Sequence, residues 1–188
     1  MLRMSLIASL WLFLGYVLQT VGLHLTTASN SAFITVLYVA FVPLYLRRLS
    51  AQTWISNGIA LIGLWLLVKP TASANLGDLL TLGSAAAFAA HMACLERYTR
   101  STDAVSLFAW QLVMMTVAML GAMWWEQPTP AMFEPSRVLV LGLVVTGILA
   151  TGAFAVQMWA QQLLPAQQVA LLFAVEPAIA AWLAWYFL

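Results

Sequence analysis

The sequence predicts an all-α integral membrane protein. Of its 188 residues, 64% are hydrophobic and only 7% are charged, and the mean hydropathy is +0.95. A soluble domain needs about a quarter of its residues charged to solvate its surface, so most side chains of this chain must face something other than water. The apolar runs show no strand alternation. Helices satisfy their own backbone hydrogen bonds, as lipid requires, and are therefore the expected structure.

Seven apolar segments are long enough, or nearly so, to cross a bilayer, which takes about 20 helical residues. The third of them is short and the sixth is long. We therefore expect about seven transmembrane helices, at residues 4–24, 28–46, 54–69, 76–97, 103–124, 137–163 and 166–188.

Polar residues and prolines separate the first four segments. The polar turn 26–30 ends the first, and the basic stretch 47–50 ends the second. Pro70 ends the third, because proline disfavours helical geometry in the residue before it. Asn75 and Asp78 then open the fourth, where the free N–H groups of a helix start favour a polar cap and an anion.

Charged and proline-rich stretches separate the later segments. The charged loop 96–100 follows the fourth segment, and the prolines of 127–130 stop the fifth. In the seventh segment, Glu176 is the only formally charged side chain of residues 169–188, and Pro177 follows it directly. That pair is unusual for an apolar helix and needs an explanation.

The basic residues predict the orientation. With seven spans, five arginines fall on one side of the membrane and only two basic residues on the other, where two glutamates accompany them. An excess of basic loop residues marks the cytoplasmic side, so we expect the N-terminus in the cytoplasm and a location in the plasma membrane, as in a bacterial inner membrane. The five are Arg3, Arg47, Arg48, Arg97 and Arg100, and the two are Lys69 and Arg137.

Several classes of function have no support in the sequence. The net charge of +1 gives no indication of nucleic acid as a partner, and Cys94 is the only cysteine, so no intrachain disulfide can form. No His-Glu-x-x-His, Gly-Ser nucleophile with a placed histidine, or Asp-rich diphosphate motif occurs. His24 and His91 lie in different segments, with no acid at ligand spacing. We expect no enzymatic activity, no cofactor and no metal.

A weak internal repeat relates residues at an offset of 138. Both copies place an apolar helix with a glutamine, a short polar turn, and an apolar helix with a proline near its middle, Pro43 or Pro177, where we expect each helix to kink. Five spans separate the copies, and because five is odd, the second copy is expected upside down. Inverted repeats are typical of secondary transporters. Gln19, Leu25, Ala28, Ala32 and Ala40 fall on Gln157, Leu163, Ala166, Ala170 and Ala178.

The repeat also predicts how the chain is divided. Residues 1–69 are expected to hold the last three helices of a first five-helix unit, and residues 76–188 the first four helices of a second. Two full units would need about 276 residues, against 188 here. We therefore expect two helices to be missing before Met1 and one after Leu188.

Three stretches of the chain follow the pattern of a known family. Residues 15–44 contain GYVLQTVGL, TTASNSAFIT and VPL; residues 77–91 contain GDLL and AAAFAAH; and residues 176–183 contain EP and AAWL. The first closely resembles the third and fourth helices of EamA-type members of the drug/metabolite transporter superfamily. The other two resemble the sixth and ninth helices. The resemblance implies a ten-helix bundle of two inverted repeats that moves small metabolites, often by export.

Glu176 is the first candidate for a substrate site. It lies about ten residues into its helix, roughly 15 Å deep and near the midplane. A charged side chain there costs about 2.5–3.5 kcal/mol and should face a partner or a cavity. Pro177 leaves the carbonyl of Phe173 without its helical donor, which adds a polar spot. Glu176 is then a site for a substrate cation or a proton, or else part of a structural kink bonded to a neighbouring helix.

Other polar residues in apolar segments are candidates to line the same cavity. Tyr38 occupies the repeat position of Glu176 and can donate a hydrogen bond; alternatively its ring packs in the core. Gln19 and Gln157 are repeat-related, and each lines a cavity or joins helices. Gln111 is cavity-lining or interfacial. His91 shares a face with Ser84 and Ala87, and serves as a ligand or proton relay, or as a packing residue.

A secondary carrier is the function that these features predict. It would move small metabolites such as amino acids or drugs by alternating access, with export as the expected direction and with the lipid bilayer and a small-molecule substrate as its partners. The alternative is a transport-inactive fragment or a structural or assembly partner in the membrane. That alternative predicts polar residues without repeat symmetry.

Overall fold

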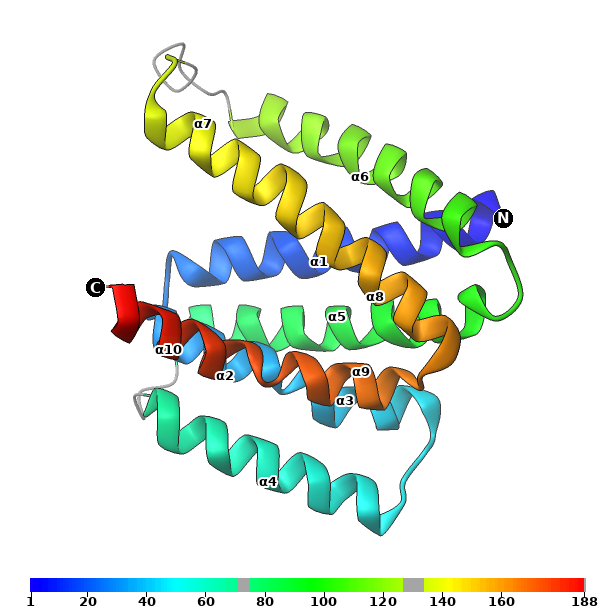
Figure 1. Ribbon diagram of the computed structural model, residues 1–188, viewed down its shortest axis with the longest axis vertical. Coiled ribbons are helices and arrows are strands. Elements are labelled where there is room, and N and C mark those ends of the chain that lie inside the picture. The colour runs from blue at the N-terminus through cyan, green and yellow to red at the C-terminus, as the bar shows by residue number, and fades with distance from the viewer. Residues whose placement is uncertain (71–74, 127–133, 188) are drawn as a thin grey trace.

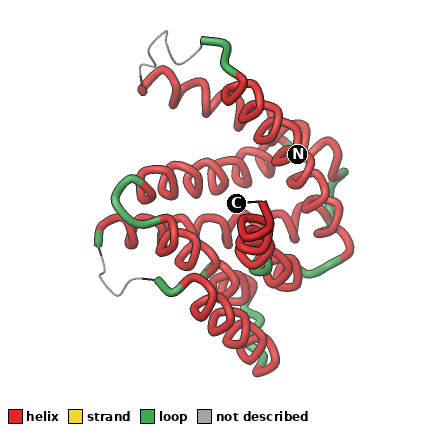
Figure 2. Tube along the Cα trace, turned by 60° about the vertical axis from the view of Figure 1, so that its left-hand side comes forward, coloured by secondary structure: helices red, strands yellow, loops and turns green. Residues whose placement is uncertain are grey.

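The computed structural model describes residues 1–70, 75–126 and 134–187, and these form a bundle of helices without a strand (Figures 1 and 2). This confirms the predicted all-α fold. The elements are α1 (Leu2–Leu23), α2 (Ala28–Val36), α3 (Tyr38–Leu46), α4 (Ala51–Val68), α5 (Leu76–Thr99), α6 (Ala104–Glu126), α7 (Arg137–Val144), the π-helical stretch η2 (Val145–Ala150), α8 (Thr151–Leu163), α9 (Ala166–Phe173) and α10 (Glu176–Phe187).

The elements combine into spans that follow the seven expected segments. Within the described residues, five continuous or nearly continuous helices are long and apolar enough to cross a membrane, and two shorter apolar helices accompany them. The short third segment and the long sixth segment are both present, the latter as α7, η2 and α8 in succession. The five are Leu2–Leu23, Ala28–Leu46, Leu76–Thr99, Ala104–Trp124 and Arg137–Leu163, and the shorter two are Ala51–Leu67 and Ala166–Ile179.

Apolar side chains cover the outer faces of the bundle. On α4, Ile55, Ile59, Ile62 and Leu66 follow one another at helical spacing and are all exposed. The stretch Arg137–Leu163 is the most apolar of the candidate spans. Water would not tolerate so much exposed apolar surface, whereas lipid would, so the chain is an integral membrane protein.

Helix α5 is the centre of the bundle. It packs against α1 along its length and also contacts α2, α3, α8 and α9. Small residues allow the closest approach: a Cβ atom added to Gly77 would lie 2.6 Å from the carbonyl oxygen of Gly22 on α1. Without an apolar driving force in lipid, such small-residue contacts let helix backbones pack closely.

Helix starts carry the caps that the sequence indicates. The side chain of Asn75 accepts from the backbone N–H of Asp78 at 2.9 Å, and the Asp78 carboxylate accepts from the backbone of Asn75 at 3.2 Å. This reciprocal pair confirms the predicted cap of α5. The Asp78 carboxylate also accepts from the hydroxyl of Thr26 and the amide of Asn30. It therefore ties the turn before α2 to the start of α5.

Two spans are interrupted at corresponding positions. The first breaks at Leu37, between α2 and α3, and the second breaks at 174–175, between α9 and α10. Helices resume at Tyr38 and Glu176, which are related by the offset of 138. The two spans also begin at an offset pair, Ala28 and Ala166. The positions of both starts and both breaks thus agree with the sequence repeat.

The first interruption differs in place from the expected proline kink. Pro43 lies inside α3, six residues after the break at Leu37. Pro43 cannot donate to the carbonyl of Val39, but the side-chain amide of Asn57 donates to that oxygen at 2.8 Å and the amide of Gln167 at 3.3 Å. These donors replace the lost helical bond, so the helix continues through the proline. The break before Pro177 falls two residues ahead of it, as expected for a proline in a helix.

A central cavity as the candidate substrate site

A cavity lies between the two interrupted spans and the central helix, and it is larger than the smaller cavity that adjoins it. Its volume is about 700 Å³, which is in the range of pockets that hold small organic ligands. Its walls come from α1, α2, α3, α5, α8, α9 and α10 and from the end of η2. The lining residues are Leu12, Tyr16, Gln19, Thr35, Tyr38, Phe88, His91, Met92, Ala150, Ala153, Phe154, Gln157, Leu172, Phe173, Glu176, Ile179 and Leu183.

Five of the six predicted site residues line this cavity, and each comes from a different helix. The sixth, Gln111, lines a smaller adjoining cavity of about 190 Å³. The two cavities share His91 and Tyr16 in their walls. The tertiary structure therefore brings together residues that lie as far as 157 positions apart in the chain. The five are Gln19, Tyr38, His91, Gln157 and Glu176.

Glu176 stands where the second interrupted span resumes. It is the first residue of α10, and its side chain is exposed on the open side of the cavity. The carboxylate is close enough to interact electrostatically with the phenols of Tyr16 and Tyr38. The start of a helix favours negative charge, because the helix dipole is positive at that end. The position therefore combines an acid with a local field that suits it.

Tyr38 is buried at the start of α3 and lines the cavity beside Glu176. No hydrogen bond joins these two described side chains. The phenol is thus positioned by packing around its ring, in the core that includes Val39 and Val42. Its hydroxyl remains at the cavity, where it can donate to a bound group.

Gln19 and Thr35 link two walls of the cavity. The amide of Gln19 donates to the hydroxyl of Thr35 at 3.1 Å, and that hydroxyl donates to the carbonyl of Ser31 at 2.7 Å. Gln19 therefore joins α1 to α2 while it lines the cavity, so both of the roles considered for it coexist. Gln157, its offset partner, is buried on α8 and also lines the cavity.

His91 and Gln111 form a buried pair between α5 and α6. The Gln111 amide nitrogen lies 2.7 Å from His91 Nε2. Because the amide nitrogen is a donor, Nε2 is the acceptor here, and the imidazole proton belongs on Nδ1. Both side chains are buried, so Gln111 occupies the bundle interior rather than the interface that sequence reasoning left open. The pair closes the floor of the smaller cavity.

Aromatic residues that sequence reasoning did not select form much of the cavity wall. The ring of Tyr16 packs edge-on against Phe88, with centroids 5.6 Å apart, and against Phe154, at 6.4 Å. One signal pointed to Tyr16: it precedes Gln19 by three residues and so shares its face of α1. Phe88 and Phe154 lie in strongly apolar runs, where nothing distinguishes a cavity wall from a packed core.

Among the described residues, no group of three or more His, Cys, Asp or Glu side chains lies close enough together to bind a metal ion. The cavity wall is mainly apolar, with a few convergent polar groups. This arrangement is typical of a binding site for a small organic molecule.

Comparison with known proteins gives the family. The model of the EamA-like transporter family matches residues 75–188. The chain belongs to the EamA-like transporter family. The matched part of this EamA chain begins at the cap of α5 and contains four of the candidate residues: His91, Gln111, Gln157 and Glu176. The family points to membrane transport rather than to enzymatic chemistry, as the sequence predicts.

A curated relative extends the similarity to most of the EamA chain. An uncharacterized transporter from Archaeoglobus fulgidus is 30% identical over 174 residues, which cover 89% of this chain and 55% of the relative. The chain thus spans about half the length of the curated relative that it matches. No solved structure matches it.

Proposed function

We propose that this chain forms the substrate-binding core of a secondary carrier that exports small organic molecules, such as amino acids or drugs, by alternating access. One observation carries the proposal: the cavity of about 700 Å³ is lined by sparse polar residues from both predicted units, with Glu176 as its acid. Carriers of inverted-repeat design bind their substrates between the two units, near the midplane and at broken helices. The interruptions at Leu37 and 174–175 both border this cavity.

Glu176 is the proposed binding group for a cationic part of the substrate or for a coupling proton. An acid at the midplane of a membrane is costly, by about 2.5–3.5 kcal/mol for Asp on insertion scales, and marks a pathway when it faces a cavity. The tyrosine and phenylalanine rings of the wall favour a cation that carries an apolar body, since aromatic faces attract positive charge. An organic amine has both properties.

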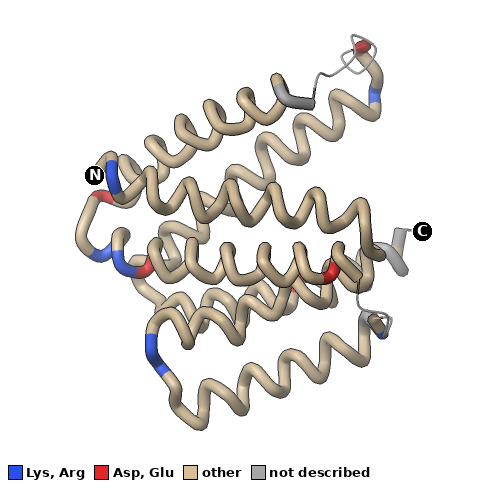
Figure 3. Tube along the Cα trace, turned by 180° about the vertical axis from the view of Figure 1, so that it is seen from behind, with Lys and Arg blue, Asp and Glu red and all other residues tan. Residues whose placement is uncertain are grey.

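The proposed orientation places the N-terminus in the cytoplasm. Figure 3 shows the basic residues gathered at the end of the bundle where the chain begins, with few at the opposite end. Three of the exposed cavity residues, Glu176, Ile179 and Leu183, belong to α10, which ends on the side away from the N-terminus (Figure 1). In this orientation we infer that the described state faces outward, which is one of the two states that an exporter must visit.

Charge removal at Glu176 tests the proposed function. Glu176→Gln keeps shape and most hydrogen bonding, so flux of a radiolabelled or fluorescent amine in vesicles, normalised to protein level, should fall at least about tenfold if the carboxylate contributes one strong interaction. Glu134→Gln is the matched control, because Glu134 is exposed outside the cavity. Wild-type flux in the Glu176→Gln variant would contradict the assignment.

The alternative of a structural or assembly partner makes a different prediction for the same position. If Glu176 only holds helices together, Gln should be nearly neutral, and Glu176→Leu should lower expression and thermal stability first, through the partner left unpaired. The match covers 55% of the length of the curated relative, so the alternative is tested as well. The two substitutions compared in one assay separate it from transport.

A further inference from the structure

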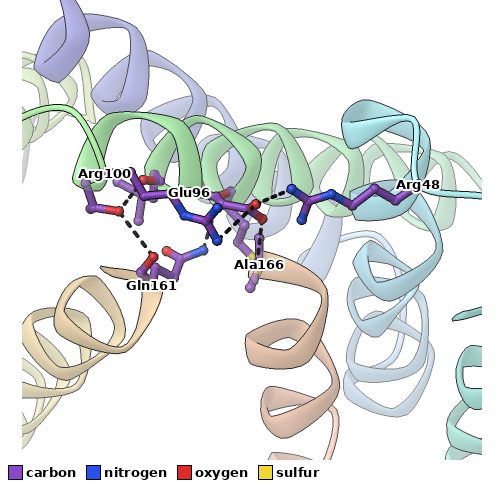
Figure 4. Close-up of polar contacts among 8 residues, drawn as sticks. Arg48, Glu96, Arg100, Gln161 and Ala166 are labelled. Atoms are coloured by element: carbon purple, nitrogen blue, oxygen red, sulfur yellow. Dashed lines mark hydrogen bonds and ion pairs between the residues drawn. The ribbon is translucent and has the colours of Figure 1, made fainter. Parts of the chain in front are cut away.

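A buried carboxylate, Glu96, binds three partners near the arginine-rich end of the bundle: Arg48, Arg100 and the backbone of Ala166 (Figure 4). Its Oε1 lies 2.7 Å from Arg48 Nη2 and 3.5 Å from Arg100 Nη2. Its Oε2 accepts from the backbone N–H of Ala166 at 2.7 Å. We call these four residues the Glu96 cluster. The sequence indicates both arginines only as orientation signals, and the structure pairs each of them with Glu96.

The Glu96 cluster joins the ends of three helices. Arg48 follows α3, Glu96 lies in the last turns of α5, and Ala166 is the first residue of α9. The backbone N–H of Ala166, free at the helix start, donates to the Glu96 carboxylate, and the helix dipole favours an anion there. One carboxylate thus holds the first interrupted span, through Arg48, and the second, through Ala166, against the central helix.

The cluster lies one helical turn beyond the cavity, because Met92 of α5 lines the cavity and Glu96 follows it by four residues. Toward this end the side chains of α5, α8 and α9 that follow or precede the cavity residues are buried: Leu95, Met158, Gln161 and Val169. The amide of Gln161 donates to the carbonyl of Met92 at 3.1 Å, which fixes α8 to α5 just beneath the cavity floor. The side chains near the Glu96 cluster are thus buried, whereas the cavity residues of α10, at the opposite end, are exposed.

The chemistry of the cluster suits a reversible closure. The Glu96 side chain is 3% exposed, whereas those of Arg48 and Arg100 are each 47% exposed. When the cavity opens at the cluster, the two guanidinium groups, which are already about half exposed, gain water at little cost. Only the buried Glu96 carboxylate then exchanges its protein partners for water. A buried ion pair adds little net stability compared with well-packed apolar residues. A contact needed only to hold the fold would gain more from apolar packing.

The central helix α5 carries a second acid, Asp78, at the end opposite Glu96. Asp78 precedes Glu96 by 18 residues, which is about five helical turns, so both acids lie on the same face of α5. Asp78 binds Asn30 in the first turn of α2, as Glu96 binds Ala166 at the first residue of α9. The starts of α2 and α9 are related by the offset of 138. Each interrupted span thus begins against an acid of α5, at opposite ends.

We propose that the Glu96 cluster is a gate: it holds the cavity closed at the arginine-rich end, and its ion pairs must break before the cavity opens there. Glu96 and Arg48 are then positioning residues of the transport cycle, acting on the balance between two states rather than on the substrate. The proposal rests on the proposed function only in assuming that the cavity opens alternately to the two sides.

Access to a cysteine in the cavity tests the gate without using transport. In a Cys94→Ala background, Ala153→Cys places a thiol in the cavity wall. Sealed vesicles of both orientations are treated with an impermeant thiol reagent. With the Glu96 cluster intact, labelling from the arginine-rich face should be slow. Glu96→Gln removes both ion pairs of the cluster and Arg48→Gln removes one. Each should speed that labelling, by about tenfold or more, by shifting the two-state balance.

Controls make the outcome decisive. Arg97→Gln removes a positive charge, as Arg48→Gln does, from the residue next to Glu96 in the sequence. Arg97 is exposed and outside the cluster, so this variant should leave the labelling rate unchanged. Arg48→Gln leaves Glu96 with Arg100 and Ala166, so this variant can be scored even if Glu96→Gln fails to fold. An unchanged rate in a folded Arg48→Gln protein overturns the gate. Wild-type flux in the Glu176→Gln protein would contradict the proposed function while leaving a faster labelling rate, and hence the gate, intact.

Discussion

At Pro43 the backbone loses a helical hydrogen bond, and two distant amides replace it. Asn57 comes from α4, 18 residues away, and Gln167 comes from α9, 128 residues away from Val39. Gln167 also donates to Asn57 Oδ1, at 2.5 Å. The three groups are buried together, so each depends on the others for its hydrogen bonds. The sequence showed the proline, but not the partners of the carbonyl it freed.

Two neighbouring glutamines of α9 give a matched test of this triad. Gln167→Leu leaves the buried oxygen of Asn57 without its donor, which should cost about 1–3 kcal/mol and lower the thermal midpoint in detergent by several degrees. Gln168→Leu is the control, because Gln168 is exposed on the same helix. Equal midpoints for the two variants would mean that the triad contributes nothing to stability.

The candidate residues could be selected because lipid makes polar groups conspicuous. A carboxylate, a phenol or an amide in an apolar run needs a reason, and Gln19, Tyr38, Gln157 and Glu176 were selected on that ground together with the offset of 138. Their functional roles remain predictions. Phe88 and Phe154 could not be selected in the same way, since an aromatic residue in an apolar segment needs no special explanation.

At the scale of helices, the crossing of α1 and α5 depends on two glycines. A Cβ atom on Gly77 would meet backbone atoms of Gly22, Leu25 and Thr26 at 2.6–2.7 Å. Backbone atoms cannot turn away as the end of a flexible side chain can. The two helices would therefore have to separate, and the capped turn that Asp78 holds would shift with them.

Substitution of this glycine should therefore be costly although alanine favours helices. Gly77→Ala is expected to lower stability by about 1–3 kcal/mol through overpacking, measured as a lower thermal midpoint in detergent. Gly63→Ala on α4 is the control, because nothing lies within 4 Å of the added Cβ atom. Helix propensity should make that change neutral or slightly stabilising. A Gly77→Ala protein as stable as the Gly63→Ala protein would contradict the close crossing.

The interruptions of the two spans show where helix-level prediction reached its limit. Both were expected near a proline, and the one at 174–175 lies next to Pro177. The other lies at Leu37, because donors from α4 and α9 satisfy the carbonyl that Pro43 leaves free. A proline marks a helix that has lost one bond, and tertiary contacts decide whether the helix breaks there.

For the whole molecule, the prediction to test is the orientation in the membrane, with the N-terminus in the cytoplasm. In a Cys94→Ala background, Ser101→Cys should be shielded from an impermeant thiol reagent in intact cells, and Glu134→Cys should be labelled. Both side chains are exposed in loops, at opposite ends of the bundle. Basic loop residues stay in the cytoplasm. Permeabilised cells, in which both must react, are the control. Labelling of Ser101→Cys from outside would reverse the orientation.

The sequence by itself determined that lipid surrounds the chain, that the chain is helical, and to which family it belongs. Hydrophobicity and helix caps are local properties, so spans, turns and the cap of α5 could be derived from neighbouring residues. The offset of 138 is also written in the sequence, and its helix starts and breaks agree with the structure, while the division into 1–69 and 76–188 stays a prediction. Only the tertiary structure decided which polar groups meet. It gathered Glu176 with four candidates around one cavity, paired His91 with Gln111, and buried Glu96 between Arg48 and Ala166. Such contacts depend on which helix faces pack together, because hydrogen bonds and ion pairs act over a few ångströms between residues far apart in the chain.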